Sequence, residues 1–356
     1  MIDVGNELGV PSYLFFSSGA AYLSLLLYLP TRNGREFEEF DDELVIPGYV
    51  NPVPSSGLPP VLFNKYGGYT TLMNHGRRLK EAKGIIVNTF EQLESHAVKC
   101  LMNDTDSVPP VYIVGPVIDL ESQSDKLVLD VTRRTEIMKW LDDQPDSSVV
   151  FLCFGSWGSF GEEQVKEIAI GLEQSGVRFL WSLRKPPLED KFEEPSDYKI
   201  DHLHEILPNG FLEKTKEIGL VCGWAPQKEV VAHKSVGGFV SHGGWNSILE
   251  SLWFGVPIVT WPKYAEQQLK AFQMVKDLGM GLELKLDYKS TGGEVVSGDE
   301  IAEAIKCVMH GAKKVRKRVK EVSENSRLAV MEGGSSFNSY RGLIDDIIRN
   351  KAMKEA

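Results

Sequence analysis

Short apolar runs alternate with amphipathic segments through the second half of the chain, and this alternation constrains the fold more than any other feature. Residues 148–154 are apolar almost throughout, and a Gly/Ser turn joins them to residues 162–174, where apolar side chains recur at helical spacing. Strands buried on both faces are apolar along their length, and parallel strands need helical connections. The pattern therefore predicts a parallel, doubly wound α/β sheet. The expected strands are residues 148–154, 178–183, 219–223, 237–241, 257–261 and 281–285, and the expected helices are 162–174, 227–233, 246–254, 266–278 and 298–309.

The first third of the chain shows the same alternation less completely, around a Pro/Gly-rich passage at residues 46–68. Strands are expected at residues 10–16, 84–89 and 111–114, and helices at 20–28 and 90–101. We predict four parts: a partial N-terminal domain over residues 1–117, a polar linker over 118–134, a C-terminal domain over 135–334, and a terminal helix over 335–356 that could close the second domain or pack back on the first.

Charge and cysteine usage narrow the classes of function. A net charge of −11 disfavours nucleic acid as a partner, because phosphate binding needs a basic surface. Four cysteines without a C-x-x-C pair suit a reducing compartment, so a cytoplasmic protein is expected. Serine and glycine interrupt the apolar stretch at residues 13–29, which therefore predicts a strand and a buried helix rather than a membrane span.

A glycine-rich loop at residues 155–161 follows the first apolar strand of the second half and opens a helix. Phosphate binds at this place in α/β sheets because amides at a helix N-terminus point at the anion, so Ser156 is a candidate phosphate contact. The spacing is G-x-x-G-x-x-G rather than G-x-G-x-x-G, and the next strand leads into Arg184 instead of an acidic residue. Both departures disfavour a nicotinamide-dependent dehydrogenase. A tight turn without a ligand is the alternative.

A second strand–turn–helix has more polar side chains. The strand at residues 237–241 ends in His242-Gly243-Gly244-Trp245-Asn246-Ser247, and Glu250 follows one helical turn deeper on the same face. A diphosphate at the helix amides would place its ribose beside Glu250, whose carboxylate can accept both hydroxyl groups. Trp224 offers a flat face for a base. In the alternative interpretation His242 is a turn residue, Trp245 fills the core and Glu250 is a solvated charge.

The next strand leads into Glu266-Gln267 at a helix start. A carboxylate and an amide side by side are matched to adjacent sugar hydroxyls. Glu266 alone would also be a favourable charge at a helix N-terminus, which is the alternative reading of this position.

Together these motifs resemble a known family. Residues 224–267 are similar to the signature box of plant family 1 UDP-glycosyltransferases, from Trp224-Ala225-Pro226-Gln227 through the His242 turn to Glu266-Gln267. Phe154-Gly155-Ser156 and residues 332–336 agree with the same family, and flavonoid, hydroxyquinone and triterpenoid glucosyltransferases look nearest. The resemblance implies a GT-B fold of two facing Rossmann-like domains, in which the N-terminal domain holds the acceptor and the C-terminal domain holds the UDP-sugar.

The resemblance also implies a role for each residue of the box. Trp224 would stack on uracil, with Ala225 and Gln227 around the base and ribose, and Glu250 would bind the ribose hydroxyls. The diphosphate would be held by Ser156, His242, Asn246 and Ser247 at the Gly244 turn, and the sugar would be oriented by Trp245, Glu266 and Gln267. A final glutamine in the box usually accompanies glucose. No metal ion or other cofactor is expected, because helix amides and His242 would take up the leaving-group charge.

The acceptor side departs from the family pattern. The family's catalytic histidine lies in a Pro-x-x-Gly-His turn and its partner aspartate on a later strand, and neither motif is present. Residues 1–4 resemble the stretch just after that aspartate, so the chain is expected to begin downstream of both, with an incomplete N-terminal domain and no catalytic residue of its own. His75 is the single histidine on this side that could serve as a base.

The sequence therefore predicts a UDP-glucose-dependent, inverting O-glucosyltransferase of small hydroxylated secondary metabolites. Its expected ligands are the UDP-sugar donor and a small lipophilic acceptor, and it is expected to be a cytoplasmic monomer that binds neither nucleic acid nor membrane. The alternative is a short protein that binds UDP-sugar without catalysing transfer.

Overall fold

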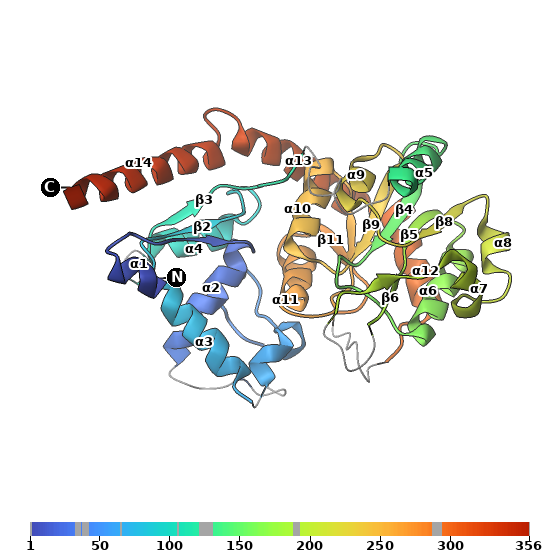
Figure 1. Ribbon diagram of the computed structural model, residues 1–356, viewed down its shortest axis with the longest axis horizontal. Coiled ribbons are helices and arrows are strands. Elements are labelled where there is room, and N and C mark those ends of the chain that lie inside the picture. Colours follow the sequence, from blue (N-terminus) through green and yellow to red (C-terminus); the bar gives the residue numbers. More distant parts are fainter. Residues whose placement is uncertain are drawn as a thin grey trace. The chain divides into compact units, whose positions relative to one another are not determined.

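The computed structural model describes residues 2–32, 37, 43–64, 66–104, 107–120, 131–187, 193–286 and 294–355 (Figure 1). The chain divides into two compact units. Unit 1 comprises Met1–Ile118, Lys276–Leu278 and Glu321–Ala356, and unit 2 comprises Asp119–Val275 and Gly279–Lys320.

Unit 2 is built on a six-stranded sheet in the order β11-β10-β9-β4-β5-β8, and every pair of neighbours in it is parallel. All residues of the two central strands, β4 and β9, are buried, which explains why neither strand contains a charged residue. The predicted parallel α/β sheet is thus confirmed. Its strands are β4 (Val149–Cys153), β5 (Arg178–Ser182), β8 (Gly219–Cys222), β9 (Val236–Ser241), β10 (Ile258–Thr260) and β11 (Gly281–Glu283).

The strand order reverses direction at the centre of this sheet. From β4 the chain moves outward through β5 to β8, then returns to β9 on the other side of β4 and moves outward again through β10 to β11. In open α/β sheets ligands bind at such a switch point, outside the carboxyl ends of the strands. The site is therefore expected where β4 and β9 end.

Helices connect and cover these strands (Figure 1). Between α6 and α12, a Cβ at Gly171 would lie 2.8 Å from the Gly298 carbonyl oxygen, so the absence of a side chain permits the close approach of the two helices. The helices of unit 2 are α5 (Val131–Asp142), α6 (Glu162–Ser175), α7 (Leu203–Ile206), α8 (Phe211–Thr215), α9 (Gln227–Ala232), α10 (Trp245–Phe254), α11 (Gln267–Phe272) and α12 (Gly298–Lys306), and α13 (Lys313–Val330) runs from unit 2 into unit 1.

Two of the predicted helices end differently from the prediction. The α-helical part of the expected helix at residues 266–278 ends at Phe272 and continues as a π-helical turn, Gln273–Asp277. The expected helix at residues 298–309 likewise passes into a π-helical turn, Cys307–Gly311. Its start is fixed by a capping box, in which Ser297 and Glu300 satisfy each other's backbone amides.

Unit 1 contains a smaller parallel sheet in the order β1-β2-β3. The amides of Ala20 and Ala21 at the start of α2 donate to the buried Glu94 carboxylate at 2.7 and 3.0 Å. The sequence did not predict α1 or α3. The elements are β1 (Tyr13–Phe16), β2 (Gly84–Val87), β3 (Val111–Ile113), α1 (Ile2–Glu7), α2 (Ala20–Tyr28), α3 (Gly68–Leu79) and α4 (Ser95–Asn103).

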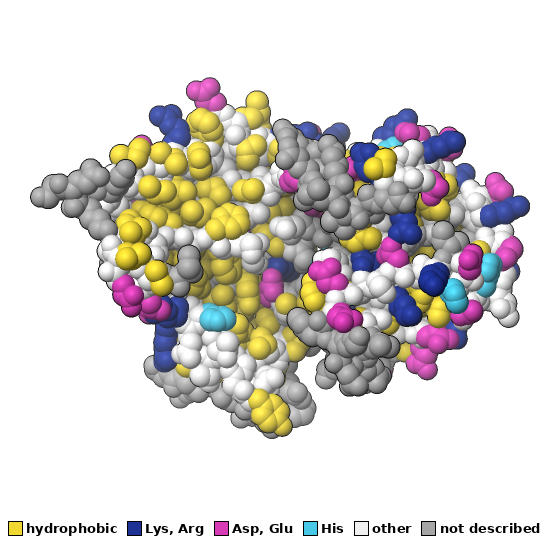
Figure 2. All heavy atoms as spheres, viewed as in Figure 1, with side chains coloured by type: hydrophobic (Ala, Val, Ile, Leu, Met, Phe, Trp, Pro, Cys, Tyr) yellow, Lys and Arg dark blue, Asp and Glu magenta, His cyan; other side chains and the backbone are white. Residues whose placement is uncertain are grey.

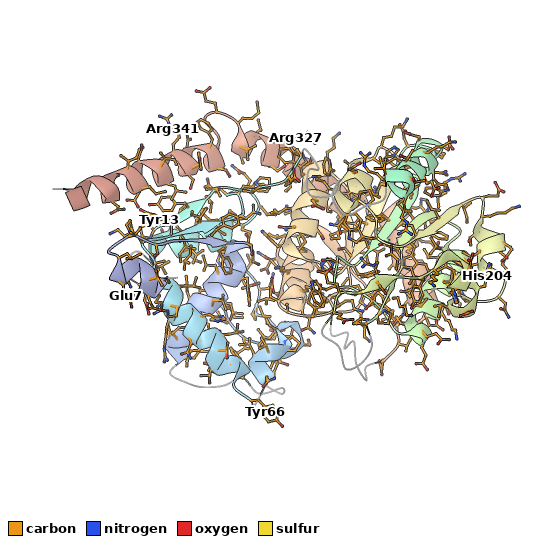
Figure 3. The ribbon with its side chains drawn as sticks, in the orientation of Figure 1. Glu7, Tyr13, Tyr66, His204, Arg327 and Arg341 are labelled. Atoms are coloured by element: carbon orange, nitrogen blue, oxygen red, sulfur yellow. The ribbon has the colours of Figure 1, made fainter. Side chains whose placement is uncertain are left out.

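The C-terminal helix α14 (Ser335–Glu355) packs on the sheet of unit 1. Tyr13 on β1 donates to Asp346 of this helix at 2.7 Å, and Asn350 donates to the Tyr13 hydroxyl at 2.8 Å (Figure 3). Figure 2 shows apolar side chains gathered over unit 1, and Phe15, Tyr340 and Ile348 are among its exposed apolar residues.

The boundaries between the parts differ from those expected from the sequence. Helix α5 begins at Val131, inside the expected linker at residues 118–134, of which residues 121–130 lie outside the described part. Residues from Glu321 onward belong to unit 1, whereas the sequence placed residues up to 334 in the second domain. Amphipathic α13 has no sequence break at which a boundary could have been predicted.

No helix among the described residues is both long and apolar enough to cross a membrane. All four cysteines are free thiols. Burial raises the pKa of Cys153 to about 11 and that of Cys222 to about 12, so both thiols are held in their unreactive protonated form.

Candidate functional site

Two loops start side by side at the switch point of unit 2. Cys153, the last residue of β4, is in register with Ser241, the last residue of β9. The glycine-rich loop at residues 155–161 and the His242 turn therefore begin at the same edge of the sheet. This brings together the two motifs that the sequence identified separately.

The His242 ring lies between two glycines. A Cβ at Gly155 would be 2.8 Å from its Cε1 atom, and a Cβ at Gly244 would be 2.5 Å from its Nε2 atom. Gly155 and Gly243 also have φ of +76° and +74°, which favour glycine. The glycines of both motifs are thus explained by the space that the imidazole ring and the turns require.

Burial of His242, with Lys270 and Lys263 nearby, lowers its pKa to about 3. The imidazole is therefore neutral near pH 7, and its Nδ1 lies 3.3 Å from the Ser241 hydroxyl. A neutral ring has one N–H group. His242 can thus act on an anion as a hydrogen-bond donor rather than as a positive charge.

Aromatic packing holds the glycine-rich loop. The rings of Phe154 and Phe160 meet edge to face at 4.6 Å, and both contact Trp261 at 5.6 and 4.8 Å. Ser156 is exposed within this loop. Its hydroxyl thus lies on an anchored loop ahead of the first turn of α6.

Three of the predicted nucleotide-binding residues form one cluster. Gln227, the first residue of α9, donates from Nε2 to the Ser247 hydroxyl at 2.9 Å and to the Glu250 carboxylate at 2.8 Å. Ser247 and Glu250 both belong to α10, one turn apart, so the amide of Gln227 fixes the carboxylate relative to the helix N-terminus. Residues from two different helices are thereby brought together.

Trp224 lies on the loop between β8 and α9, half-buried, and Ala225 beside it is buried. The backbone N–H of Trp224 donates to the Asp197 carboxylate at 2.9 Å. Sequence reasoning missed Asp197, because it lies in a charged insertion, residues 185–207, whose path back to this loop has no local sequence signal.

At the predicted sugar-binding end the side chains are held by neighbouring groups. The Gln267 side-chain oxygen accepts the backbone amides of Lys263 and Tyr264 at 2.9 and 3.1 Å, which leaves its NH₂ group as the donor for a ligand. Glu266 forms an ion pair with the buried Lys270, whose Nζ lies 5.9 Å from the Trp245 ring centroid. Trp245 is buried, and Asn246 is exposed at the start of α10.

Lys263 is a second residue that the sequence did not single out. Its Nζ donates to the Ser159 carbonyl and lies 3.3 Å from the Phe160 ring centroid, so it ties the loop after β10 to the glycine-rich loop. Only 8% of Lys263 is exposed, and burial lowers its pKa to about 7.

We expect the stability difference between Lys263→Met and the wild type to depend on pH. The unfolded lysine titrates near 10.5, so between about pH 7 and 10.5 the unfolded wild type binds one proton more than the folded wild type does. The wild type should gain stability relative to the variant across this window, by at most ~1.4 kcal/mol per pH unit. Below pH 7 the full cost of the buried charge is present.

Urea unfolding at pH 6, 7.5 and 9 measures the difference in stability between the wild type and the variant. Lys139→Met, which replaces an exposed lysine of α5, is the control. An equal dependence of stability on pH in both variants would contradict this account.

Histidines outside this site have other environments. His75 is exposed in the middle of α3, a helix that the sequence did not predict. His202 lies 3.2 Å from Glu205, and His204 projects from α7 at the rim of unit 2 (Figure 3). Among the described residues, no group of three His, Cys, Asp or Glu side chains could hold a metal ion.

Comparisons with known proteins point to one family. The model of the UDP-glucoronosyl and UDP-glucosyl transferase family matches residues 132–324. UDP-glycosyltransferase 71K1 of Malus domestica is 56% identical over 352 residues, 98% of this chain and 72% of that protein. Anthocyanidin 3-O-glucosyltransferase 1 of Manihot esculenta is 52% identical over 355 residues, 98% of this chain and 76% of that protein. The structure of Medicago truncatula UGT71G1 complexed with UDP-glucose has a TM-score of 0.86 at 50% identity, and the match covers 98% of this chain and 73% of that chain.

Proposed function

Because this chain belongs to the UDP-glucoronosyl and UDP-glucosyl transferase family, we propose that it is a UDP-glucose-dependent, inverting O-glucosyltransferase of small hydroxylated secondary metabolites. The observation that supports this most is the cluster of Gln227, Ser247 and Glu250, which joins α9 to α10, the helix that begins directly after the buried His242 turn. The similar proteins add the donor and the acceptor class, since one is bound to UDP-glucose and another is named for anthocyanidin.

In the proposed complex the nucleotide lies along the carboxyl edge of the sheet. Uracil stacks on Trp224 beside Ala225, and the ribose hydroxyls bind to Glu250, which Gln227 orients. The diphosphate binds at the N-terminus of α10 and at the glycine-rich loop. Glucose then lies toward Trp245, Glu266 and Gln267. The other diphosphate contacts are Ser156, His242, Asn246 and Ser247, at the Gly244 turn.

The reaction joins an acceptor oxygen to the anomeric carbon. The acceptor hydroxyl attacks C1 of glucose from the face opposite the diphosphate, the bond from C1 to the phosphate oxygen breaks, and its electron pair leaves with UDP, which inverts the configuration. The amides of α10 and the neutral His242 N–H would stabilise the charge on the leaving diphosphate. We therefore propose that transfer needs no metal ion or other cofactor, and UDP-glucose is the donor substrate.

The hydroxyl proton must leave to a base, and we assign this step to none of the described residues. His75 is exposed on α3, and within the described part of unit 1 no hydrogen bond or ion pair joins it to an acidic side chain. This observation favours the second candidate function, a protein that binds UDP-sugar without catalysing transfer. Glucosyl transfer by the purified chain is thus expected to be slow.

The remaining proposals concern the setting of the protein. We propose a cytoplasmic monomer whose ligands are the UDP-sugar donor and a small lipophilic hydroxylated acceptor. The free cysteines support a reducing compartment, and the net charge of −11 supports a protein that binds neither nucleic acid nor anionic membrane.

A transfer assay distinguishes the two candidate functions. The purified chain is incubated with UDP-glucose and a panel of flavonols and simple phenols, and glucosides are measured by mass spectrometry alongside UDP release. We expect a slow, UDP-glucose-dependent glucoside signal that Glu250→Ala removes. Tight UDP-glucose binding with no glucoside from any acceptor would instead establish the binding-only function. Absence of both binding and transfer would contradict both candidates.

A further inference from the structure

A short ribbon in unit 2 lies against the Trp224 loop. After β5 the chain forms β6 (Arg184–Lys185), which pairs antiparallel with β7 (Ser196–Asp197), and Arg184 is opposite Asp197. Residues 188–192 of the connection lie outside the described part. The pairing brings the charged insertion back toward the edge strand β8. The Asp197 carboxylate thereby lies next to the loop that follows β8.

The Asp197 carboxylate is shared by three donors from separate parts of the chain. Its Oδ1 accepts the backbone N–H of Trp224 at 2.9 Å and lies 3.1 Å from Arg184 Nε. Its Oδ2 pairs with Arg133 on α5. Arg184 is 9% exposed and Arg133 about a third exposed, so the two cations fix the carboxylate from the protein side.

The loop is also shaped around this carboxylate. A Cβ at Gly223 would lie 2.2 Å from Asp197 Cγ, so the residue before Trp224 has no side chain where the carboxylate sits. On the other side of Trp224, Gln227 is tied to Ser247 and Glu250. The segment from Gly223 to Gln227 is thus held at both ends, by Asp197 at one and by α10 at the other.

We propose that Asp197 is a positioning residue for donor binding, which sets the direction of the Trp224 ring by holding its backbone N–H. The inference rests on the proposed function, in which Trp224 stacks on uracil. Asp197 does not touch the nucleotide and acts through Trp224. Stacking requires the Trp224 ring to lie parallel to the base. If the loop moves, the ring loses this contact although the tryptophan side chain is still present.

A double-mutant cycle tests this coupling. Asp197→Ala should weaken UDP binding about 5- to 50-fold by isothermal titration calorimetry, the factor expected for one hydrogen bond to a charged acceptor together with part of the stacking. In a Trp224→Ala background the same substitution should have almost no further effect, because the two act through one contact. An equal loss in both backgrounds, or no loss in either, would overturn the proposal.

Asp197→Asn separates positioning from general stability. Asparagine can still accept the Trp224 N–H but cannot form the ion pairs with Arg133 and Arg184, so it should recover most of the UDP affinity whatever its effect on the unfolding midpoint. If the asparagine variant binds UDP as poorly as the alanine variant, Asp197 acts through its ion pairs and the proposal fails. Asp201→Ala, an exposed carboxylate in the same insertion, is the matched control.

A readout without ligand keeps this inference separate from the proposed function. The tryptophan fluorescence of each protein minus that of its Trp224→Phe derivative comes from the Trp224 ring alone. Acrylamide quenching of this difference signal measures how accessible that ring is to solvent. Asp197→Ala should raise the accessibility of that ring, and Asp197→Asn should not. Unchanged quenching would overturn the positioning role even if UDP binds. Raised quenching in a protein whose wild type binds no UDP would contradict the proposed function and leave the Asp197–Trp224 coupling supported.

Discussion

Replacing Glu250 by alanine is expected to weaken UDP binding about 100-fold. In the proposed complex its carboxylate accepts both ribose hydroxyls, and a hydrogen bond to a charged group contributes ~1.5–3 kcal/mol. Loss of ~3 kcal/mol corresponds to about 100-fold in the dissociation constant. The fold should survive, because Gln227 keeps the Ser247 hydroxyl at 2.9 Å as its acceptor. Titration calorimetry with UDP measures the effect.

A second ligand shows whether the ribose is the group that Glu250 binds. The wild type should bind UDP more tightly than 2′-deoxy-UDP, and Glu250→Ala should bind the two equally, because the partner of the 2′-hydroxyl is gone. Glu163→Ala removes an exposed carboxylate from the first turn of α6 and should leave both affinities unchanged. A Glu250→Ala variant that keeps the wild-type preference for UDP would place the ribose elsewhere.

Replacing Gly244 by alanine is expected to lower UDP affinity about 10- to 100-fold without unfolding the protein. Its φ of −59° and ψ of 145° suit any L-residue, but the new Cβ would lie 2.5 Å from His242 Nε2. The imidazole must move from the turn, and the diphosphate then loses a hydrogen bond to a charged acceptor, worth ~1.5–3 kcal/mol. Titration calorimetry and the thermal midpoint separate the loss of binding from the loss of stability.

The glycine-rich loop contains a matched control for this substitution. Gly161 precedes α6 as Gly244 precedes α10, with φ of −66° and ψ of 163°, and a Cβ there would meet nothing within 4 Å. Gly161→Ala should therefore leave UDP affinity and stability unchanged. If both alanine variants bind UDP as the wild type does, the position of His242 has no role in diphosphate binding.

The core of unit 2 could be predicted closely from the sequence. A strand buried on both faces needs apolar residues at every position, so residues 148–154 indicated β4 (Val149–Cys153) to within one residue at each end. The π-helical turn after Phe272 could not be predicted, because apolar spacing does not distinguish it from one more α-helical turn. In the first third of the chain α3 was missed, since its helical pattern follows the irregular Pro/Gly-rich passage directly.

The site was predictable only where its residues are close in sequence or belong to a known motif. The His242 turn and Glu250 lie on one strand–turn–helix, Trp224 offered a flat face for a base, and the resemblance to a family added Gln227. Asp197 and Lys263 were missed because their contacts reach across the sheet: Asp197 needs the β6–β7 ribbon, and Lys263 reaches Ser159 from a different loop. Such contacts depend on tertiary packing, and neither residue stands out by local pattern.

Calorimetric titration of the purified 356-residue chain with UDP-glucose, with and without EDTA, tests the central claim most directly. We expect one donor molecule per chain to bind, with an affinity that EDTA does not change, because helix amides and side chains of unit 2 hold the diphosphate. Failure to bind UDP-glucose or UDP at millimolar concentration would contradict the assignment of the switch point as a donor site. Binding that EDTA removes would contradict the metal-free mode of binding.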